Sequence, residues 1–346
     1  MKYLPVLLFA LVFSAASWGA SVDQPLRIAM ISDGGSFSDN SFNQNCREGL
    51  EEILYSGAPV YVQFYEPLPG EQFSRQLAAF AERNYRIVIA VGALMAPHLE
   101  RTARLYPNTF FVGVDADLVP ADNVQTLTFQ VDECAFPAGY LAAAWADLQD
   151  PDDPAVAWVG GQSVDSVNQF TVAFVNGVRH YNKTKGRSVR VMGRHIGSFN
   201  RPDAGKACAQ QFIAKEGVDV VFGVGGSTGC GAIQAAFDAS KWAIGVDTDQ
   251  YYTLPDVAPV LLTSCLKRMD RAVKFVVEGA LDGQYWGGTR YVGNLENHGI
   301  GLAPFHDLDS QIPDDLRLEL HNLQRQILAG TITTGWTPGS LPEAVP

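Results

Sequence analysis

Four stretches of the sequence carry hydrogen-bonding side chains, aromatic rings or glycines in a pattern that could bind a ligand. The first, Asp33–Gln44, reads DGGSFSDNSFNQ and includes Asp33, Phe42 and Asn43. Carboxylate and amide groups hydrogen-bond to ligands, and aromatic rings pack against flat ones. The stretch directly follows an apolar run, so it is predicted as a binding loop at the end of a strand.

The other three stretches also follow apolar runs. They are Gly197–Pro202 with Phe199, Gly223–Gly231 with Gly225 and Gly226, and Gly245–Gln250 with Asp247, extended by Thr263–Arg268 with Lys267. Glycines at a strand-to-helix junction let the backbone approach a ligand and aim helix N–H groups at it. The glycine stretch has no following Lys-Ser/Thr and lacks the third glycine of G-x-G-x-x-G, so neither a Walker loop nor a dinucleotide site is expected.

The same residues also have purely structural interpretations, which the pattern leaves open. Ser41 or Asn40 could cap the helix that follows, and Phe42 could belong to the core. Asp247 and Lys267 could form an ion pair at the surface.

Apolar runs alternate with helix-like spacing along the chain. Strands are predicted at 27–31, 60–65, 86–91, 109–114, 155–159, 189–196, 218–224, 242–246 and 260–263. Helices are predicted at 42–54, 73–80, 133–147, 166–181, 203–215, 229–239 and 268–280. Continuous rather than alternating apolar strands indicate parallel sheets covered on both faces. The fold class is therefore α/β, with two doubly wound parallel-sheet lobes joined by a hinge.

The order of these elements predicts how the chain divides between the lobes. We expect 25–127 with 251–285 in the first lobe, and 128–250 with 286–330 in the second. A first crossing is expected near 126–130, and residues 331–346, rich in Thr, Gly and Pro, are expected to form a mobile tail. Ligands bind at the carboxyl ends of parallel strands, so the four stretches should face a cleft between the lobes.

The overall charge excludes one class of partner. Lys and Arg number 25 and Asp and Glu 37, which gives 25 − 37 = −12. Affinity for nucleic acid rests on clustered basic side chains, which this sequence lacks. No nucleic-acid partner is expected.

Residues 1–20 predict an export signal. Lys2 precedes the apolar run 4–13, and small residues follow up to Ala20. This is the pattern of a secretory signal peptide, and the apolar run is too short to span a bilayer. No cysteine stands near the junction, so we expect a soluble periplasmic protein without a lipid anchor.

Cysteine and histidine usage argues against a metal site or an enzyme. The cysteines are Cys46, Cys134, Cys208, Cys230 and Cys265, without zinc-ligand spacing. A disulfide between Cys208 and Cys230 and five separate buried thiols are both compatible with the sequence. No catalytic triad order, HExxH or nucleophile elbow is present, so no enzymatic activity, metal or cofactor is expected.

Taken together, the motifs resemble the basic-membrane-protein (Bmp/PnrA-like) family of ABC-transporter solute-binding proteins, over almost the whole chain after residue 20. The motifs that carry the resemblance occur in one order: D-x-G-x-x-x-D-x-S-F-N-Q at 33–44, A-G-Y-L-A at 138–142, the 197–199 turn, the glycine stretch, G-V-D-T-D-Q at 245–250, T-S-x-x-K-R at 263–268 and G-I-G-L-A-P at 299–304.

The resemblance implies a type I periplasmic-binding-protein fold that closes on a purine nucleoside and delivers it to a membrane permease. By position, Phe42 and Phe199 would sandwich the base and Asp33 would hold its edge. Asp247 and Lys267 would bind the ribose, with a backbone N–H from Gly225 or Gly226. The protein would act as a monomer.

Departures from the family pattern bear on the ligand and on the anchor. The family's common members are lipoproteins, and segment 93–97, where some members contact the base, reads ALMAP here. A receptor subunit for signalling, or a binding protein for another small solute, is the alternative function.

Overall fold

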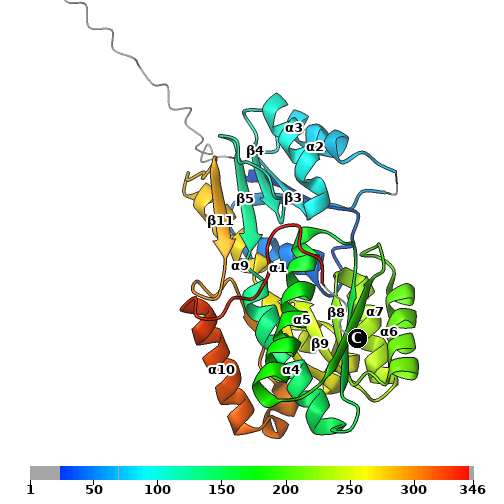
Figure 1. Cartoon of the computed structure of the whole chain (residues 1–346). Coiled ribbons are helices and arrows are strands. Elements are labelled where there is room, and N and C mark those ends of the chain that lie inside the picture. The colour runs from blue at the N-terminus through cyan, green and yellow to red at the C-terminus, as the bar shows by residue number, and fades with distance from the viewer. Residues whose placement is uncertain (1–23, 69, 343–346) are drawn as a thin grey trace, which may run out of the picture.

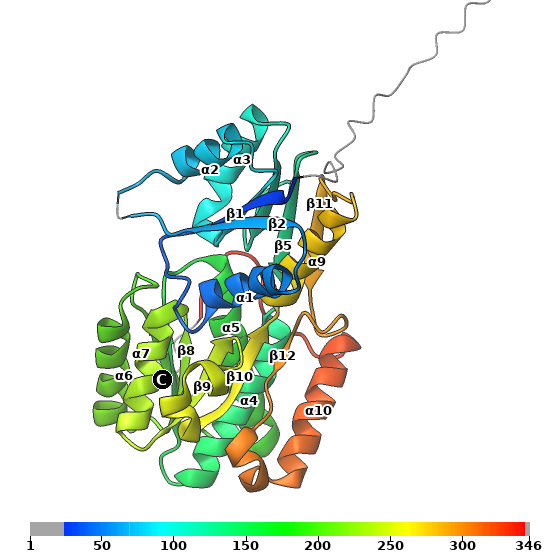
Figure 2. The same cartoon turned by 180° about the vertical axis from the view of Figure 1, so that it is seen from behind.

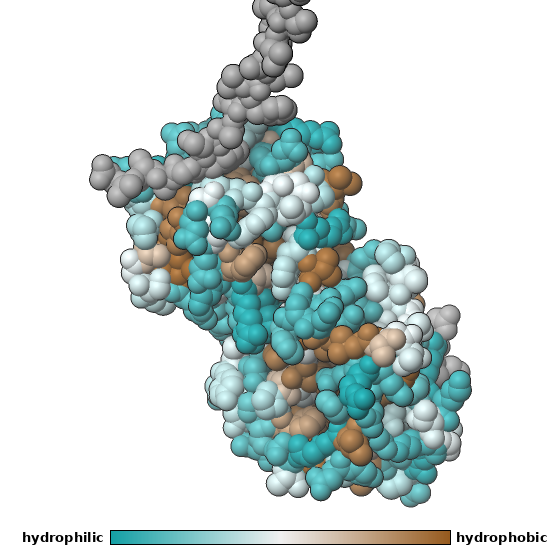
Figure 3. Space-filling model, turned by 90° about the vertical axis from the view of Figure 1, so that its left-hand side faces the viewer, coloured by the Kyte–Doolittle hydropathy of each residue, from teal (hydrophilic) through white to brown (hydrophobic). Residues whose placement is uncertain are grey.

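The computed structural model describes residues 24–68 and 70–342, so the predicted signal peptide lies outside the described residues. The chain forms two α/β lobes, seen one above the other in Figure 1 and as a two-lobed outline in Figure 3. Each lobe contains one six-stranded sheet with helices on both faces. The predicted fold class is confirmed.

The sheet of the first lobe has the order β11-β5-β4-β3-β1-β2, and all its strand pairs are parallel. Its strands are β1 (Leu26–Ser32), β2 (Val60–Tyr65), β3 (Ile87–Val91), β4 (Phe110–Val114), β5 (Val124–Phe129) and β11 (Thr289–Gly293). One face is covered by α1 (Phe42–Tyr55) and α9 (Met269–Leu281), the other by α2 (Phe73–Glu82) and α3 (Ala96–Leu105). Both faces are apolar, as continuous hydrophobic strands require.

The sheet of the second lobe has the order β12-β10-β9-β8-β6-β7, and β12 alone runs antiparallel to its neighbour. Its strands are β6 (Ala155–Gly160), β7 (Arg190–His195), β8 (Val220–Val224), β9 (Trp242–Asp247), β10 (Leu261–Lys267) and β12 (Ile300–Leu302). α4 (Asp132–Gln149) and α5 (Asp165–Lys185) cover one face, with α10 (Asp314–Leu328) packed on α4; α6 (Pro202–Glu216) and α7 (Gly226–Asp238) cover the other. Short helical turns complete the chain: Ala93–Met95, α8 (Gln250–Thr253), Pro255–Val260 and His306–Gln311.

The chain crosses between the lobes three times. It leaves the first lobe after β5, at the expected position, returns after β10, and leaves again between β11 and β12. The predicted division at the later crossings is wrong. β10 pairs with β9 and so belongs to the second sheet, whereas β11 pairs with β5 in the first. An apolar strand can join either sheet. Which sheet it joins depends on the strand it pairs with, and the sequence of the strand alone does not give that partner.

The predicted mobile tail spans 331–346, of which 343–346 lie outside the described residues, and residues 331–342 are held by hydrogen bonds. Thr334 is buried; its hydroxyl donates to Asp132 Oδ2 at 2.5 Å, and its carbonyl accepts from Asn176 Nδ2 at 2.8 Å. Farther along, the Gly339 N–H donates to Asp165. The segment therefore follows a fixed path along α4 and α5 toward the space between the lobes, where Figure 1 shows it in red.

All five cysteines are free, so the disulfide between Cys208 and Cys230 is not formed. Four of the thiols are buried in the lobes, which agrees with the alternative expectation of separate buried thiols. Among the described residues, no helix is both long and apolar enough to cross a membrane.

Two glycines let α4 and α5 pack backbone against backbone. A Cβ at Gly139 would lie 2.0 Å from the Phe174 carbonyl oxygen, and one at Gly177 would lie 2.0 Å from that of Phe136. Gly139→Ala should therefore force the helices apart and lower the free energy of unfolding by about 1–3 kcal/mol. Denaturant unfolding measures the loss. In Gly301→Ala the new methyl group meets no atom within 4 Å, so an equal loss in that control would contradict the packing argument.

Candidate functional site

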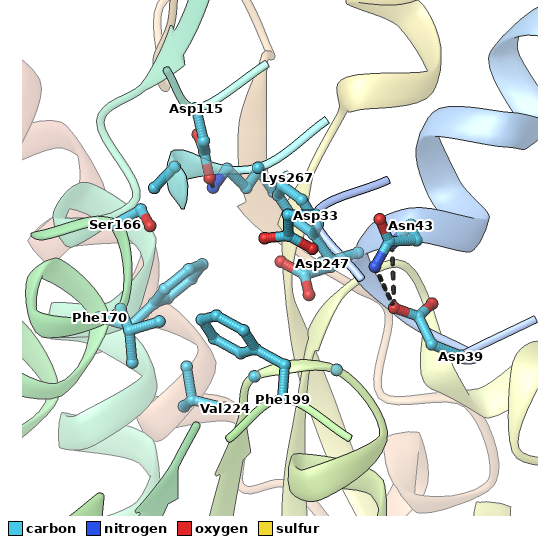
Figure 4. A pocket seen from close by; sticks show the side chains of 16 residues that line it. Asp33, Asp39, Asn43, Asp115, Ser166, Phe170, Phe199, Val224, Asp247 and Lys267 are labelled. Carbon is cyan, nitrogen blue, oxygen red and sulfur yellow. Dashed lines mark hydrogen bonds and ion pairs between the residues drawn. The ribbon is translucent and has the colours of Figure 1, made fainter. Parts of the chain in front are cut away.

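A cavity lies between the lobes where the carboxyl ends of the central strands of both sheets face each other (Figure 4). Each of the eight predicted ligand-binding residues lines it: Asp33, Phe42, Asn43, Phe199, Gly225, Gly226, Asp247 and Lys267. The first three follow β1. Phe199, Gly225 and Gly226 follow strands of the second lobe, and Asp247 and Lys267 end strands of that lobe. The free volume between the side chains is about 40 Å³, far below the ~300–1,000 Å³ of typical ligand pockets. The lobes are therefore closed on each other in this conformation.

Asp33 stands at the end of β1, and its carboxylate lies against the backbone of Gly92. A Cβ at Gly92 would be 2.2 Å from Asp33 Oδ2, and Gly92 has a φ of 112°, so this approach requires glycine. Burial, with a smaller contribution from the nearby Asp39, raises the pKa of Asp33 to about 7. The group therefore exchanges its proton near neutral pH.

Asp39 caps helix α1, in place of the Ser41 or Asn40 that the sequence suggested. Its carboxylate accepts hydrogen bonds from the backbone N–H groups of Ser41, Asn43 and Gln44 at 3.0–3.1 Å. Burial still leaves the pKa of Asp39 above its ordinary value, although these hydrogen bonds lower it. The hydroxyl of Ser41 is thereby free to donate to Asp247 Oδ2 across the lobes, at 2.6 Å.

Lys267 and Asp247 are buried, so the interpretation as a surface ion pair is wrong. The Lys267 ammonium pairs with Asp115, which follows β4 in the first lobe. Burial raises the pKa of Asp247 to about 6, whereas Lys267 and the Ser41 hydroxyl lower it. Asp115 and Asp247 have φ values of 56° and 70°. Such a left-handed conformation costs about 1–2 kcal/mol in a residue other than glycine, and strained backbone of this kind gathers at functional sites.

Three phenylalanines form the apolar part of the cavity. Phe42 comes from the first lobe and Phe170 and Phe199 from the second, and Figure 4 shows the last two rings directed into the cavity. The Lys267 Nζ lies 5.2 Å from the ring centroid of Phe42 and 5.8 Å from that of Phe170. A flat ligand entering the cavity would therefore meet aromatic rings from both lobes.

Gly225 makes room for Phe199 at the floor of the cavity. A Cβ at Gly225, whose φ is 115°, would lie 2.7 Å from the backbone nitrogen of Gly161 and 3.3 Å from the Phe199 ring. Helix α7 starts at Gly226, the next residue. The first N–H groups of a helix lack partners within it and attract hydrogen-bond acceptors. That of Thr228 already donates to the Phe199 carbonyl oxygen at 3.1 Å, so a ligand would meet the N–H of Gly226 at the start of the helix.

Hydrogen-bond acceptors outnumber donors among the side chains that line the cavity. Four carboxylates, those of Asp33, Asp39, Asp115 and Asp247, face the single ammonium of Lys267. Asn43 is buried too, and its Oδ1 has no hydrogen-bond partner among the described residues. A ligand rich in N–H and O–H donors would satisfy these acceptors.

Sequence reasoning missed Asp115, Ser166 and Phe170. Asp115 directly follows β4, whereas Ser166 and Phe170 lie in the first turns of α5, the helix that follows β6. The rule that led to the four stretches would have reached these positions as well. A single Asp or Ser in a short connection did not stand out as a motif.

Cys230, whose role the sequence left open, is a structural contact in helix α7. Its Sγ lies 3.4 Å from the carbonyl oxygen of Asp39 and from Gln250 Nε2, so it joins the loop before α1 to the second lobe. In the part of the chain that the structure describes, no group of three or more His, Cys, Asp and Glu side chains is placed to hold a metal ion.

Comparison with known proteins gives related sequences and a related fold. The family of PnrA-like ABC transporter substrate-binding proteins matches residues 26–334. The ABC transporter nucleoside-binding protein BmpA of Lactococcus lactis subsp. cremoris is 27% identical over 319 residues, which cover 87% of each chain. An uncharacterized lipoprotein of Pyrococcus furiosus is 26% identical over 306 residues, 86% of this chain and 75% of the relative. The solute-binding protein of an ABC transporter system from Aeropyrum pernix K1 superposes with a TM-score of 0.82 at 24% identity, covering 91% of this chain and 94% of the other.

The two sheets and the crossings between the lobes give this chain the type I fold of periplasmic solute-binding proteins. Because the family match extends over residues 26–334, the chain belongs to the PnrA-like family of ABC transporter substrate-binding proteins.

The raised pKa of Asp33 predicts how the stability of the ligand-free protein depends on pH. An ordinary Asp loses its proton near pH 3.8 in the unfolded chain and here near 7 in the folded one, so folding binds a proton between these values. Stability should therefore fall as the pH rises from about 4 to about 7. Asp33→Asn should remove much of this fall and raise the Tm at pH 8, by about 2–4 °C per kcal/mol recovered.

Thermal unfolding at several pH values measures this effect, and Asp152→Asn, at an exposed carboxyl group, is the matched control. An Asp33→Asn variant that melts below the wild type at pH 8 would contradict the assigned pKa shift.

Proposed function

We propose that this protein binds a purine nucleoside between its lobes and delivers it to the permease of an ABC transporter. The observation that carries the proposal is the composition of the cavity, where aromatic rings from both lobes meet an excess of hydrogen-bond acceptors. A purine has two π-faces for stacking and N–H donors on its edge, and a ribose adds hydroxyl donors. The name of the Lactococcus relative, a nucleoside-binding protein, agrees with this ligand.

Each part of the nucleoside has a place in the cavity. The base stacks between Phe42 and Phe199, at about 1–3 kcal/mol per contact, while Asp33 and the unpartnered Oδ1 of Asn43 accept hydrogen bonds from its edge. Asp247 and Lys267 bind the ribose hydroxyls, and helix α7 offers its first N–H groups at Gly226.

The carboxylates also define what the cavity excludes. A nucleoside monophosphate would bring about two negative charges into a buried space that already holds four carboxylates and one ammonium. Burying like charges together is costly, so nucleotides are rejected. The protein therefore selects nucleosides after their phosphates have been removed.

Binding shifts the equilibrium between open and closed lobes toward the closed form. The cavity is too small for a nucleoside when the lobes are closed without ligand, so the solute enters the open form. It then bridges residues of both lobes, which stabilises closure, and the closed protein is recognised by the permease. We further propose that the protein is exported and acts in the periplasm.

We expect adenosine, guanosine or inosine to raise the Tm of the protein, since a ligand at about a hundred times its Kd adds about 2.7 kcal/mol of stability. The matching 5′-monophosphates, free sugars and amino acids should give no shift. Phe42→Ala and Asp247→Ala should each weaken nucleoside binding at least tenfold, measured by calorimetry on protein freed of carried-over ligand.

Phe237→Ala is the control, because Phe237 lies partly exposed near the end of α7 and does not line the cavity. Wild-type affinity in both folded site variants would contradict the site. A rise with another solute and none with nucleosides would contradict the ligand.

Nucleoside affinity should also depend on pH through Asp33. A base N–H donates a stronger, charge-assisted hydrogen bond to the ionised carboxylate than to the protonated carboxyl group, so protonation below the pKa of about 7 weakens binding. Because half of the sites are protonated at the pKa and most of them one unit below, the Kd should rise about tenfold from pH 8 to pH 6. Titration calorimetry at both pH values tests this, with proton release on binding as a second measure. A Kd that rises toward pH 8 would exclude a hydrogen bond to ionised Asp33.

A further inference from the structure

The loop 34–41, which connects β1 to α1 in the first lobe, is hydrogen-bonded to the second lobe through its backbone. Three of its carbonyl oxygens accept hydrogen bonds from side chains of the second lobe. Asn200 Nδ2 donates to Gly34 at 2.7 Å, Cys230 Sγ to Asp39 at 3.4 Å, and both Gln250 Nε2 and Thr253 Oγ1 to Asn40 at 3.0 Å. We name this loop and its four partner side chains the latch.

The latch lies beside the cavity and takes almost no part in its lining. Within the loop, only Asp39 lines the cavity. The lining includes none of the four partner side chains, Asn200, Cys230, Gln250 and Thr253. The same latch contacts therefore form whichever nucleoside lies in the cavity.

The latch also lies far from the connections about which the lobes move. Figures 1 and 2 show the loop, in dark blue, on the side of the molecule away from β11, after which the chain crosses to the second lobe. When two lobes rotate apart about their connections, the points farthest from the connections separate most. Opening therefore breaks the latch contacts.

The contact between Gln250 and Asn40 is fixed from both sides before the lobes meet. In the second lobe, Gln250 is buried, and its Oε1 accepts a hydrogen bond from the Val246 N–H at 2.9 Å. In the first lobe, the Asn40 N–H donates to Gln44 Oε1 at 3.2 Å. Groups that are already held in place lose little conformational entropy when they bond to each other. The contact thus favours the closed form.

We propose that the latch sets how tightly the closed form is held, and so scales the affinity for every nucleoside by one common factor. This inference rests on the proposed nucleoside function and adds to it residues that act on affinity without touching the solute. Closure without solute is costly because four carboxylates and one ammonium line the cavity, so the empty protein is mostly open. The Kd is then inversely proportional to the equilibrium constant of closure. Asn200 and Thr253 are therefore positioning residues.

Thr253→Val tests the proposal by replacing the hydroxyl donor with a methyl group of similar size. It should raise the Kd of adenosine, guanosine and inosine by the same factor, about twofold to tenfold, the range expected for the loss of one hydrogen bond. Because the solute enters the open form, the association rate should stay unchanged and the dissociation rate should carry the whole factor. Stopped-flow fluorescence with each nucleoside measures both rates.

Asn200→Ala tests the other end of the latch and should have an effect of similar size. The two contacts share no partner, so the double variant should raise the Kd by the product of the two factors. Thr184→Val is the matched control, because the Thr184 hydroxyl donates to the His180 carbonyl oxygen at 2.8 Å within α5, in the second lobe alone. Its Kd and both of its rates should equal those of the wild type.

Alkylation of Cys230 measures the opening of the solute-bound protein directly. In the closed form its Sγ contacts Asp39 and Gln250, and burial raises the pKa of the thiol to about 12, so little reactive thiolate is present. At one saturating adenosine concentration, the alkylation rate in Thr253→Val should rise by the same factor as the Kd, as followed by mass spectrometry. The rate at Cys208, which is buried inside the second lobe, should stay the same.

An unchanged Kd in folded Thr253→Val and Asn200→Ala would overturn the latch. Factors that differ between the nucleosides would overturn it too, since the substitutions would then act on the cavity itself. If the wild type binds none of the nucleosides, the proposed function is wrong and the latch proposal falls with it. The wild-type measurement thus separates the two failures.

Discussion

The burial of four carboxylates around one lysine is the constraint on which the closed form depends. Lys267 neutralises Asp115, and three backbone N–H groups stabilise Asp39, but Asp33 and Asp247 lack a comparable partner, and burial raises the pKa of both. An uncompensated buried charge is expensive. The empty closed form must therefore take up protons, whereas a solute with N–H and O–H donors removes this need. Closure is coupled to the solute for this electrostatic reason.

The α/β architecture is what allows charges from distant parts of the sequence to gather in one place. In the first sheet Asp33 follows β1 and Asp115 follows β4, with β3 between these two strands. In the second sheet Asp247 ends β9 and Lys267 ends the adjacent β10. Figure 2 shows both sheets from behind. Because all these strands are parallel within their sheets, their carboxyl ends meet at one edge. The Ser41 and Lys267 contacts then join the two edges directly. Each lobe thus supplies a rigid half of the site.

The sequence predicts the strands and the site loops well, because continuous apolar runs and clustered polar residues are local signals. β1, β2 and β6 lie within a residue or two of their predicted bounds, and the eight expected residues line one cavity. Strand partners are not local: β10 and β11 exchange lobes relative to the prediction. Asp115 and Phe170 were missed because each acts singly, and the ordering of 331–342 depends on Asp132 and Asn176, which lie far away in the sequence.

Stability and binding make opposite demands on this interface. The lobes have dense apolar cores, whereas the cavity holds strained Asp115 and Asp247, three carboxylates with raised pKa and an unpartnered amide oxygen on Asn43. The uncompensated polar groups cost free energy in the empty closed form, and a ligand that donates hydrogen bonds to them removes that cost. In an open form water reaches these polar groups and hydrogen-bonds to them, so they do not carry this free-energy cost. The free energy released on binding therefore comes from groups that line the cavity between the lobes. It favours closure of the lobes rather than the folding of either lobe.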